Sequence, residues 1–245
     1  MTRTLTALCA LAFSAVGVLT GCASDIDGSA TPTPVTAESA TTERTSPNSW
    51  LSTVLPTGDE LSKDVGRRVR VDTLPPLLGT IDDLRDTVSG TEDTNSSCIT
   101  VVSPLERQAY ADSTVRAVTY STQSTITAGA VWLSSESDAR ALFTALSDRW
   151  RQCDGTSYTT STGGLQFDHQ IAEVKSTNDV VSAIVGVTST SGGAPVRTER
   201  ALGVARDCIV EAEVPVTASP DTLDQGTAAT NVVATMLARV NSAQR

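Results

Sequence analysis

The most regular pattern of hydrophobic and polar residues lies between Ser135 and Trp150. Ser135 is a suitable helix N-cap, and Asp138 follows three residues later. Apolar side chains then recur at intervals of three and four residues: Ala139, Leu142, Phe143, Leu146 and Trp150. This spacing predicts an amphipathic helix with one apolar face. A short β-rich run at 130–133 leads directly into it, which indicates a helix packed on a sheet.

Strand-like segments contain most of the other apolar residues. Alternating or β-rich runs predict strands at 115–120, 130–133, 165–174, 180–188, 197–205 and 208–216. The last two are expected to form a hairpin around Arg206-Asp207, whereas the polar residues 158–164 give no strand prediction. In the final strand, Glu211 and Glu213 alternate with apolar residues, which predicts a sheet with one face in water.

Three further helices are predicted around these strands. Thr57 and Glu60 have the spacing of a capping box before a helix at 58–65. A second short helix is expected at 77–88, and a closing amphipathic helix at 221–241. The order of helices, strands, helix, strands and helix predicts a single α+β domain with a mainly antiparallel sheet.

Three aspartates in the predicted 77–88 helix suggest a metal site. Asp82, Asp83 and Asp86 lack the Asp-x-Asp-x-Asp-Gly order of a calcium loop. We therefore interpret them as the solvated face of the helix, with a metal site as the alternative.

Charge and composition exclude several classes of function. The 245 residues include 18 Lys and Arg against 28 Asp and Glu, a formal charge of −10 that argues against nucleic-acid binding. The sequence contains one histidine, His169, and no nucleotide-binding, serine-hydrolase or zinc-protease motif. We therefore expect no cofactor, no metal and no enzymatic activity. Cys208 with His169 is the one thiol–base pair that a thiol hydrolase could use.

The N-terminus has the order of a bacterial lipoprotein signal. An apolar run at 5–18 is too short to span a bilayer, and Leu19-Thr20-Gly21-Cys22 resembles a lipobox. We predict a signal peptide at 1–21, lipid attachment at Cys22 and anchoring to the extracytoplasmic face of the cell membrane. The alternative is ordinary cleavage that leaves Cys22 as a plain thiol.

A spacer separates this anchor from the folded part of the chain. Residues 22–49 are rich in Ser, Thr and Pro and contain hardly any large apolar side chain, so we predict a disordered tether. O-mannosylation of this tether and an unmodified spacer are equal alternatives. The folded domain is predicted at 50–245.

Cysteine arithmetic leaves three thiols in the mature domain, because Cys9 leaves with the signal peptide and Cys22 is predicted to be lipidated. An oxidising compartment permits one disulfide, and we select Cys98–Cys153, with Cys153–Cys208 as the alternative. Cys208 begins an apolar strand, so we interpret it as a buried, inert thiol.

Several of these elements together resemble the PknH-like extracellular domain family. The resemblance rests on Leu55-Pro56-Thr57, Cys98, Pro104, Tyr110, Val131-Trp132-Leu133, Phe143, Trp150-Arg151-Gln152-Cys153-Asp154-Gly155 and Arg200-Ala201-Leu202. It covers about residues 50–240 and implies a twisted antiparallel sheet flanked by helices, a Cys98–Cys153 disulfide and a ligand-binding groove. Family members commonly carry a second cysteine pair near Arg200, whereas here only Cys208 lies nearby.

These observations favour a non-enzymatic sensor domain that binds an unknown small molecule, lipid or glycan at the membrane. A module that docks to another envelope protein is the second hypothesis, and a thiol hydrolase using Cys208 and His169 is the third. Tyr110, Tyr120 and Trp132 are the candidate groove-lining residues, because aromatic rings bind sugars and lipids well. For Trp132, which lies in a strand beside the predicted buried helix, we favour core packing over a role in the groove.

Overall fold

The structure is a computed structural model that describes residues 48–71, 75–87, 96–162, 164–216 and 227–243. The predicted signal peptide, Cys22 and the tether up to residue 47 lie outside the described residues. Within those ranges, none of the helices combines the length and the apolarity that crossing a bilayer requires.

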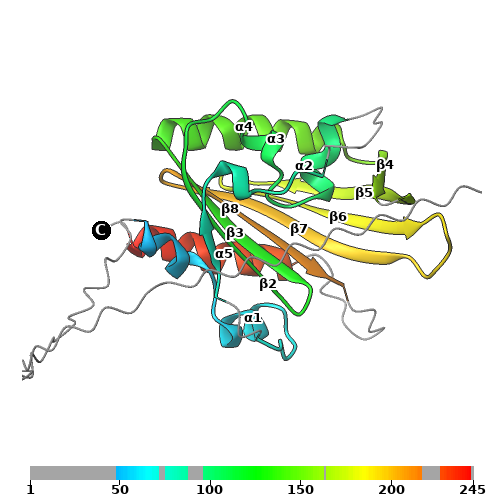
Figure 1. The fold of residues 1–245 in the computed structure, drawn as a ribbon, viewed down its shortest axis with the longest axis horizontal. Coiled ribbons are helices and arrows are strands. Elements are labelled where there is room, and N and C mark those ends of the chain that lie inside the picture. Colours follow the sequence, from blue (N-terminus) through cyan, green and yellow to red (C-terminus); the bar gives the residue numbers. More distant parts are fainter. Residues whose placement is uncertain (1–47, 72–74, 88–95, 163, 217–226, 244–245) are drawn as a thin grey trace, which may run out of the picture. The chain divides into compact units, whose positions relative to one another are not determined.

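An eight-stranded sheet forms the centre of the domain (Figure 1). Its strands follow the spatial order β1-β2-β3-β8-β7-β6-β5-β4, and each neighbouring pair is antiparallel. Their bounds are β1 Leu77–Gly79, β2 Val115–Gln123, β3 Ile126–Leu133, β4 Ser157–Thr162, β5 Leu165–Ser176, β6 Val180–Ser189, β7 Val196–Ala205 and β8 Cys208–Pro215.

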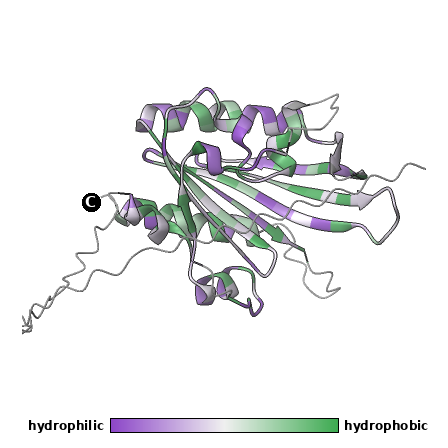
Figure 2. Ribbon diagram, in the orientation of Figure 1, coloured by the Kyte–Doolittle hydropathy of each residue, from purple (hydrophilic) through white to green (hydrophobic). Residues whose placement is uncertain are grey.

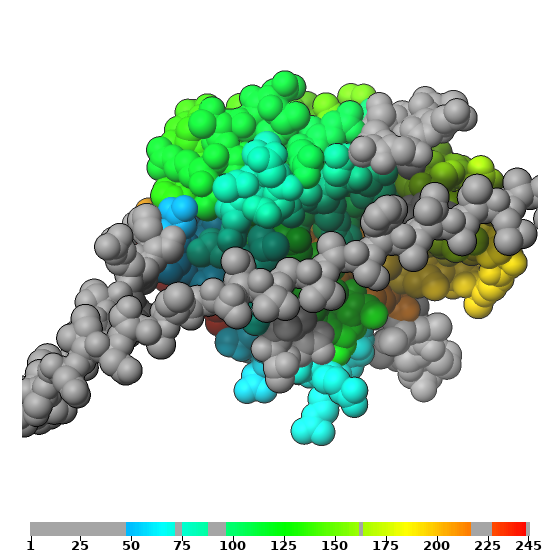
Figure 3. Space-filling view, in the orientation of Figure 1, coloured from blue at the N-terminus to red at the C-terminus, as the bar shows by residue number. Residues whose placement is uncertain are grey.

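Helices cover both faces of this sheet (Figure 1). The α-helices are α1 Gly58–Asp64, α2 Ile99–Val102, α3 Arg107–Tyr110, α4 Glu136–Gln152 and α5 Ala228–Ala243, and the 3-10 helices are η1 Ser49–Val54, η2 Ile81–Asp83 and η3 Ser96–Cys98. The α2, α3 and α4 helices lie on one face, and α5, α1 and η1 lie on the other. Figure 3 shows the α2–α3 part of the chain in teal beside α4 in green.

Side-chain alternation along the strands divides the interior into two cores. On β8, Ile209 packs with α4, whereas Cys208 and Val210 pack with α5. The absence of a side chain at Gly203 allows α5 to approach closely, because a Cβ there would lie 2.7 Å from Val233. Figure 2 shows the resulting mixture of apolar and polar positions along the central strands.

The elements that capping residues, hydrophobic periodicity and turn residues predicted are confirmed. The capping box of Thr57 and Glu60 begins α1, and Ser135 caps α4 by accepting a hydrogen bond from the Asp138 amide. The β7–β8 hairpin turns at residues 206–207 as predicted. The α+β architecture with an antiparallel sheet is confirmed as well.

The predicted helix at 77–88 is wrong. Leu77–Gly79 instead forms the edge strand β1, because these residues pair with 118–120 of β2. Asp83 then closes one 3-10 turn by accepting a hydrogen bond from the Thr80 amide. Asp82, Asp83 and Asp86 are all exposed, in agreement with the interpretation of a solvated surface.

Two other boundaries differ from the predictions. The polar passage at 158–164 contains strand β4, which pairs with β5 although it has no apolar alternation. The closing helix is α5, which begins at Ala228, and residues 221–226 of the predicted helix lie outside the described residues. Its predicted apolar face is confirmed, since Val233, Met236 and Val240 are fully buried.

The disulfide joins Cys98 to Cys153, as predicted. Cys98 lies in η3 and Cys153 is the C-cap of α4, so the bond attaches the start of α2 to the end of the long helix. We name residues 97–110, which contain α2 and α3, the covering segment. The disulfide therefore holds the N-terminal end of this segment against α4.

Replacing both Cys98 and Cys153 by serine should lower the free energy of unfolding by about 4 kcal/mol, because the bond closes a loop with a sequence separation of 55. Guanidinium denaturation followed by circular dichroism measures this change. Reduction of the wild type by dithiothreitol should reproduce the loss, while the double variant should not respond to reductant. Equal stability of the oxidised wild type and the variant would contradict the prediction.

Candidate functional site

A buried arginine attaches the covering segment to the sheet. Arg200 on β7 is 0% exposed, and its guanidinium donates 2.9 and 3.3 Å hydrogen bonds to the backbone carbonyls of Val101 and Thr100 in α2. It also donates to the Ala212 carbonyl of β8 at 3.0 Å. One side chain of the sheet therefore binds the last turn of α2 directly.

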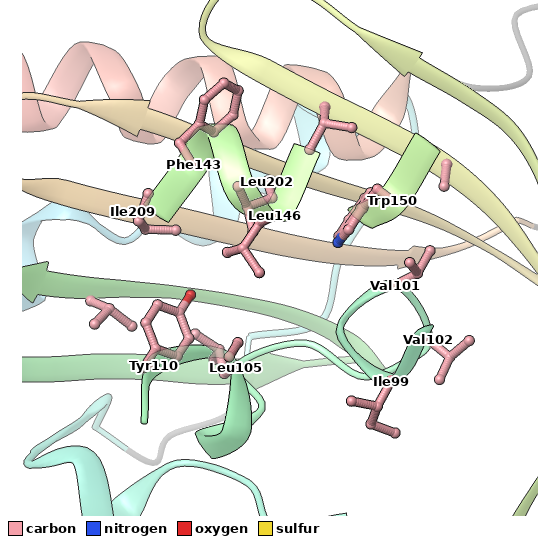
Figure 4. Close-up of a cluster of buried hydrophobic side chains, with 14 of the residues drawn as sticks. Ile99, Val101, Val102, Leu105, Tyr110, Phe143, Leu146, Trp150, Leu202 and Ile209 are labelled. Atoms are coloured by element: carbon pink, nitrogen blue, oxygen red, sulfur yellow. The ribbon is translucent and has the colours of Figure 1, made fainter. Parts of the chain in front are cut away.

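Glu211 balances the charge of Arg200 inside the protein. Its Oε2 accepts a 2.9 Å hydrogen bond from Arg200, and its Oε1 accepts a 2.6 Å hydrogen bond from the Tyr110 hydroxyl of α3. Burial and the neighbouring Glu211 carboxylate raise the pKa of Tyr110, so this hydroxyl stays protonated and remains a donor. Figure 4 shows the Tyr110 hydroxyl directed into the space between the covering segment and Leu146 of α4.

The prediction that Glu211 lies on a wet sheet face is therefore wrong. Glu211 is only 3% exposed, because the covering segment and α4 bury the face of β8 that carries it. A buried charge pair must be fully hydrogen-bonded to be tolerated, and here α2, α3 and the neighbouring strand supply those bonds. Glu213, two residues farther along, is half-buried.

A cavity of about 270 Å³ opens next to this network, between the covering segment and the sheet. Its lining comes from two sources. Residues before and within the covering segment form one wall: Arg85, Thr87, Ile99, Val102 and Ser103. The sheet forms the other wall with one residue from each of five neighbouring strands: Glu213, Thr198, Val187, His169 and Thr160.

These five sheet residues form a row that runs diagonally across the strands, since Glu213 lies opposite Arg200 and Thr198 lies opposite Val185. Each lies two positions along its strand from a buried residue on the same face, as Glu213 does from Glu211 and Thr198 does from Arg200. The corresponding core residues on β6, β5 and β4 are Val185, Ile171 and Tyr158. Two residues along each strand thus separate the packed core from a largely polar part of the sheet face. The cavity lies at this boundary.

Arg85 and Glu213 give the cavity two opposite charges. The Arg85 guanidinium donates a 3.3 Å hydrogen bond to the Thr127 hydroxyl, and Thr127 lies opposite Glu213 in the β3–β8 pairing. Among the residues that the structure describes, neither Arg85 nor Glu213 belongs to an ion pair. Both charges are half-buried and face the same small space.

His169 lies in the sheet wall of the cavity. Its Nε2 lies 2.9 Å from the Thr160 hydroxyl across β4 and β5. Its Nδ1 is buried and, in the described part of the chain, has no hydrogen-bond partner. Burial lowers the pKa of this imidazole, although the nearby Asp168 carboxylate opposes the effect. The ring is therefore neutral at pH 7.

The sequence-family model of the PknH-like extracellular domain matches residues 46–239 of this chain. The chain belongs to this family. Its fold is similar to a crystal structure of the extracellular domain of PknH from Mycobacterium tuberculosis, with a TM-score of 0.66 and 17% sequence identity. That similarity covers 80% of this chain and 96% of the other. A search of curated proteins found no match.

In this member of the PknH-like family, the three aromatic residues predicted to line a groove are not brought together. Tyr110 is fully buried in the Glu211 network, and Tyr120 is half-buried with its hydroxyl donating to the Asp83 carbonyl. Trp132 lies on the α5 face, where it packs edge-to-face on Trp50 with ring centroids 5.3 Å apart. None of the three is among the described residues that line the 270 Å³ cavity.

The thiol–base pair is also not formed. Cys208 is 0% exposed in the core beneath α5, whereas His169 lies on the opposite face of the sheet, in the cavity wall. Burial and the nearby Asp207 carboxylate raise the pKa of the Cys208 thiol to about 12, so it is not a thiolate nucleophile at neutral pH. The interpretation of Cys208 as a buried thiol is confirmed.

Of the described residues that line the cavity, sequence reasoning singled out only His169, as the base of a thiol hydrolase. Arg85 and Thr198 attracted no functional interpretation, and Glu213 was assigned to a wet face. One signal was available: Thr160, His169, Thr198 and Glu213 are polar, and each has a buried residue two positions away on the same face of its strand. That signal requires the strand register, which a single sequence does not supply.

Replacing Arg200 by methionine should lower the free energy of unfolding by about 3–5 kcal/mol, because Glu211 would remain buried without its cation. The double variant Arg200→Met/Glu211→Leu should regain part of this loss. The matched control is Arg140→Met, whose exposed pair with Asp179 should contribute about 0–1 kcal/mol. Urea denaturation at pH 7 measures all three, and equal losses for Arg200→Met and Arg140→Met would contradict the account.

The single histidine makes the pKa of His169 directly measurable by NMR titration of its ring protons. We expect a value below 6.5 in the folded protein. As pH falls through about 6.5, the unfolded chain binds a proton that the folded chain does not, so folding stability decreases. The variant His169→Gln should lack this part of the pH dependence in denaturation experiments between pH 7.5 and 5.5. A measured pKa at or above 6.5 would show that the imidazole is not desolvated.

Proposed function

We propose that this chain is an envelope lipoprotein whose extracytoplasmic domain binds a ligand without changing it chemically. Membership of the PknH-like extracellular domain family supports the location and the sensor role. The solved relative from Mycobacterium tuberculosis is likewise an extracellular domain. The lipobox ending at Cys22 supports a lipid anchor, and residues 22–49 supply a tether to the domain.

The observation that carries the binding role is the polar row on the sheet beneath the covering segment. A sheet face covered by chain normally presents apolar side chains, yet here His169, Thr198 and Glu213 face a space of about 270 Å³. Ligand sites combine an apolar lining with a few convergent polar groups, and Ile99, Val102 and Val187 supply the apolar part.

The positions of the reactive groups support binding over catalysis. Cys208 and His169 lie on opposite faces of the sheet, so the proposed thiol hydrolase lacks its pair. In the cavity, the described hydroxyls belong to Thr87, Ser103, Thr160 and Thr198. His169 lies in the same wall and uses Nε2 to bind Thr160 on the neighbouring strand. This arrangement fixes the imidazole within the wall.

Replacing Cys22 by serine should move the protein from the membrane fraction to the soluble fraction, because lipid attachment needs the thiol. Cell fractionation and palmitate labelling measure the change, and Cys208→Ala is the matched cysteine control that should stay membrane-bound and labelled. An unchanged distribution of Cys22→Ser would contradict the predicted anchor.

Ligand binding is tested by thermal shift with panels of envelope lipids, glycans, peptides and amino acids. A ligand of this cavity should raise the melting temperature of the wild type. It should not raise that of Thr198→Trp, whose indole ring would occupy the cavity. The matched control is Thr144→Trp on the exposed surface of α4, which should respond like the wild type. A ligand that stabilises Thr198→Trp equally, or a complete lack of stabilising ligands, would contradict the proposed site.

A further inference from the structure

We propose that the cavity selects a small zwitterion, a free amino acid or short peptide that carries both an ammonium group and a carboxylate. This inference rests on the proposed function, because it specifies the ligand class of the same cavity. It starts from the unpaired opposite charges of Arg85 and Glu213.

Arg85 provides a place for a carboxylate. Backbone hydrogen bonds fix its position, since its amide donates to the Leu105 carbonyl at 3.1 Å and its carbonyl accepts from the Arg107 amide at 2.7 Å. The guanidinium uses one of its five N–H groups on Thr127, which leaves donors available for the forked contact that a carboxylate favours. Arg85 therefore presents an oriented cation to the cavity.

Glu213 provides a place for an ammonium group. It is half-buried at the β8 position of the sheet wall, and Thr127 of β3 lies directly opposite it. The buried side chain of Glu106 adds a second negative group behind the other wall: its Oε1 accepts a 2.9 Å hydrogen bond from the Thr87 amide. The Oε2 of Glu106 has no hydrogen-bond partner among the described residues. Glu213 in one wall and Glu106 behind the other both favour a ligand group that carries a positive charge.

The two charges do not neutralise each other directly. Both line one small space, yet no Arg85–Glu213 contact within 4.0 Å occurs in the described structure. Half-buried charges without counterions lose hydration, and this cost is recovered when a partner of opposite charge binds each of them. A zwitterion supplies both counterions in a single molecule and leaves the net charge of the cavity unchanged.

Size and lining restrict the ligand further. A volume of about 270 Å³ lies just below the range of about 300–1,000 Å³ typical of drug-sized ligand pockets, so it suits an amino acid or a dipeptide. Ile99, Val102 and Val187 give an apolar side chain something to pack against. The neutral His169 ring adds no further cation that would compete for the carboxylate.

The experiment titrates the full mature chain with L-leucine, D-leucine and alanyl-leucine, and with two blocked analogues of leucine. N-acetylleucine lacks the ammonium group and leucinamide lacks the carboxylate. Calorimetry and the NMR signal of the single His169 ring report binding. At least one of the three zwitterions should bind, and the N-acetylated and amidated forms of the compound that binds should each bind at least tenfold more weakly.

Charge-removing variants assign each group of the ligand to its partner. Arg85→Gln should remove the preference for leucine over leucinamide, and Glu213→Gln should remove the preference for leucine over N-acetylleucine. The control Arg140→Gln, on the outer surface of α4, should retain both preferences. Circular dichroism verifies that each variant is folded, and a folded variant that keeps the preference assigned to it would overturn the inference.

The outcomes also separate this inference from the proposed function. If a neutral glycan or a simple anion binds the wild type, is blocked by Thr198→Trp, and the zwitterions do not bind, the cavity is a ligand site but the zwitterion inference is overturned. If neither the zwitterions nor any member of the envelope panels binds, both are overturned.

Discussion

Arg200 and Glu211 are buried together between the sheet and the covering segment, and the arrangement of this face depends on their contact. The guanidinium binds two carbonyls of α2, and the carboxylate binds the Tyr110 hydroxyl of α3. Two short helices of four residues each have little stability of their own. The charge pair therefore holds these helices on the sheet, and the Cys98–Cys153 disulfide joins the start of α2 to the end of α4.

The same constraint accounts for the location of the cavity. The covering segment packs on the strand positions that carry Arg200 and Glu211. Trp150 of α4 packs against the Arg200 guanidinium, with 5.6 Å between its ring centroid and Cζ. One step farther along the strands, the sheet presents Thr198, Glu213 and their neighbours to the cavity of about 270 Å³. A ligand bound there would contact both the covering segment and five strands, so its binding would stabilise the attachment of the covering segment to the sheet.

Sequence patterns predicted the parts of the fold that local chemistry determines. The capped, periodic helix ending at Trp150 and the β7–β8 hairpin needed no distant partner to be recognised. Strands β1 and β4 were missed because one is three residues long and the other is polar, and both form through pairing with a neighbour. The charges of the site were missed for a related reason. Alternation places Glu211 on one side of a strand, but only the packing of residues about 100 positions earlier decides that this side is dry.

Amide hydrogen exchange of the Arg200→Met variant tests most directly whether the charge pair holds the covering segment. With the disulfide intact, peptides spanning residues 99–110 should exchange at least tenfold faster than in the wild type, while α5 on the opposite face keeps its protection. This pattern corresponds to local release of the segment from a folded sheet. Unchanged exchange at 99–110, or an equal acceleration throughout α5 and the segment, would contradict the account.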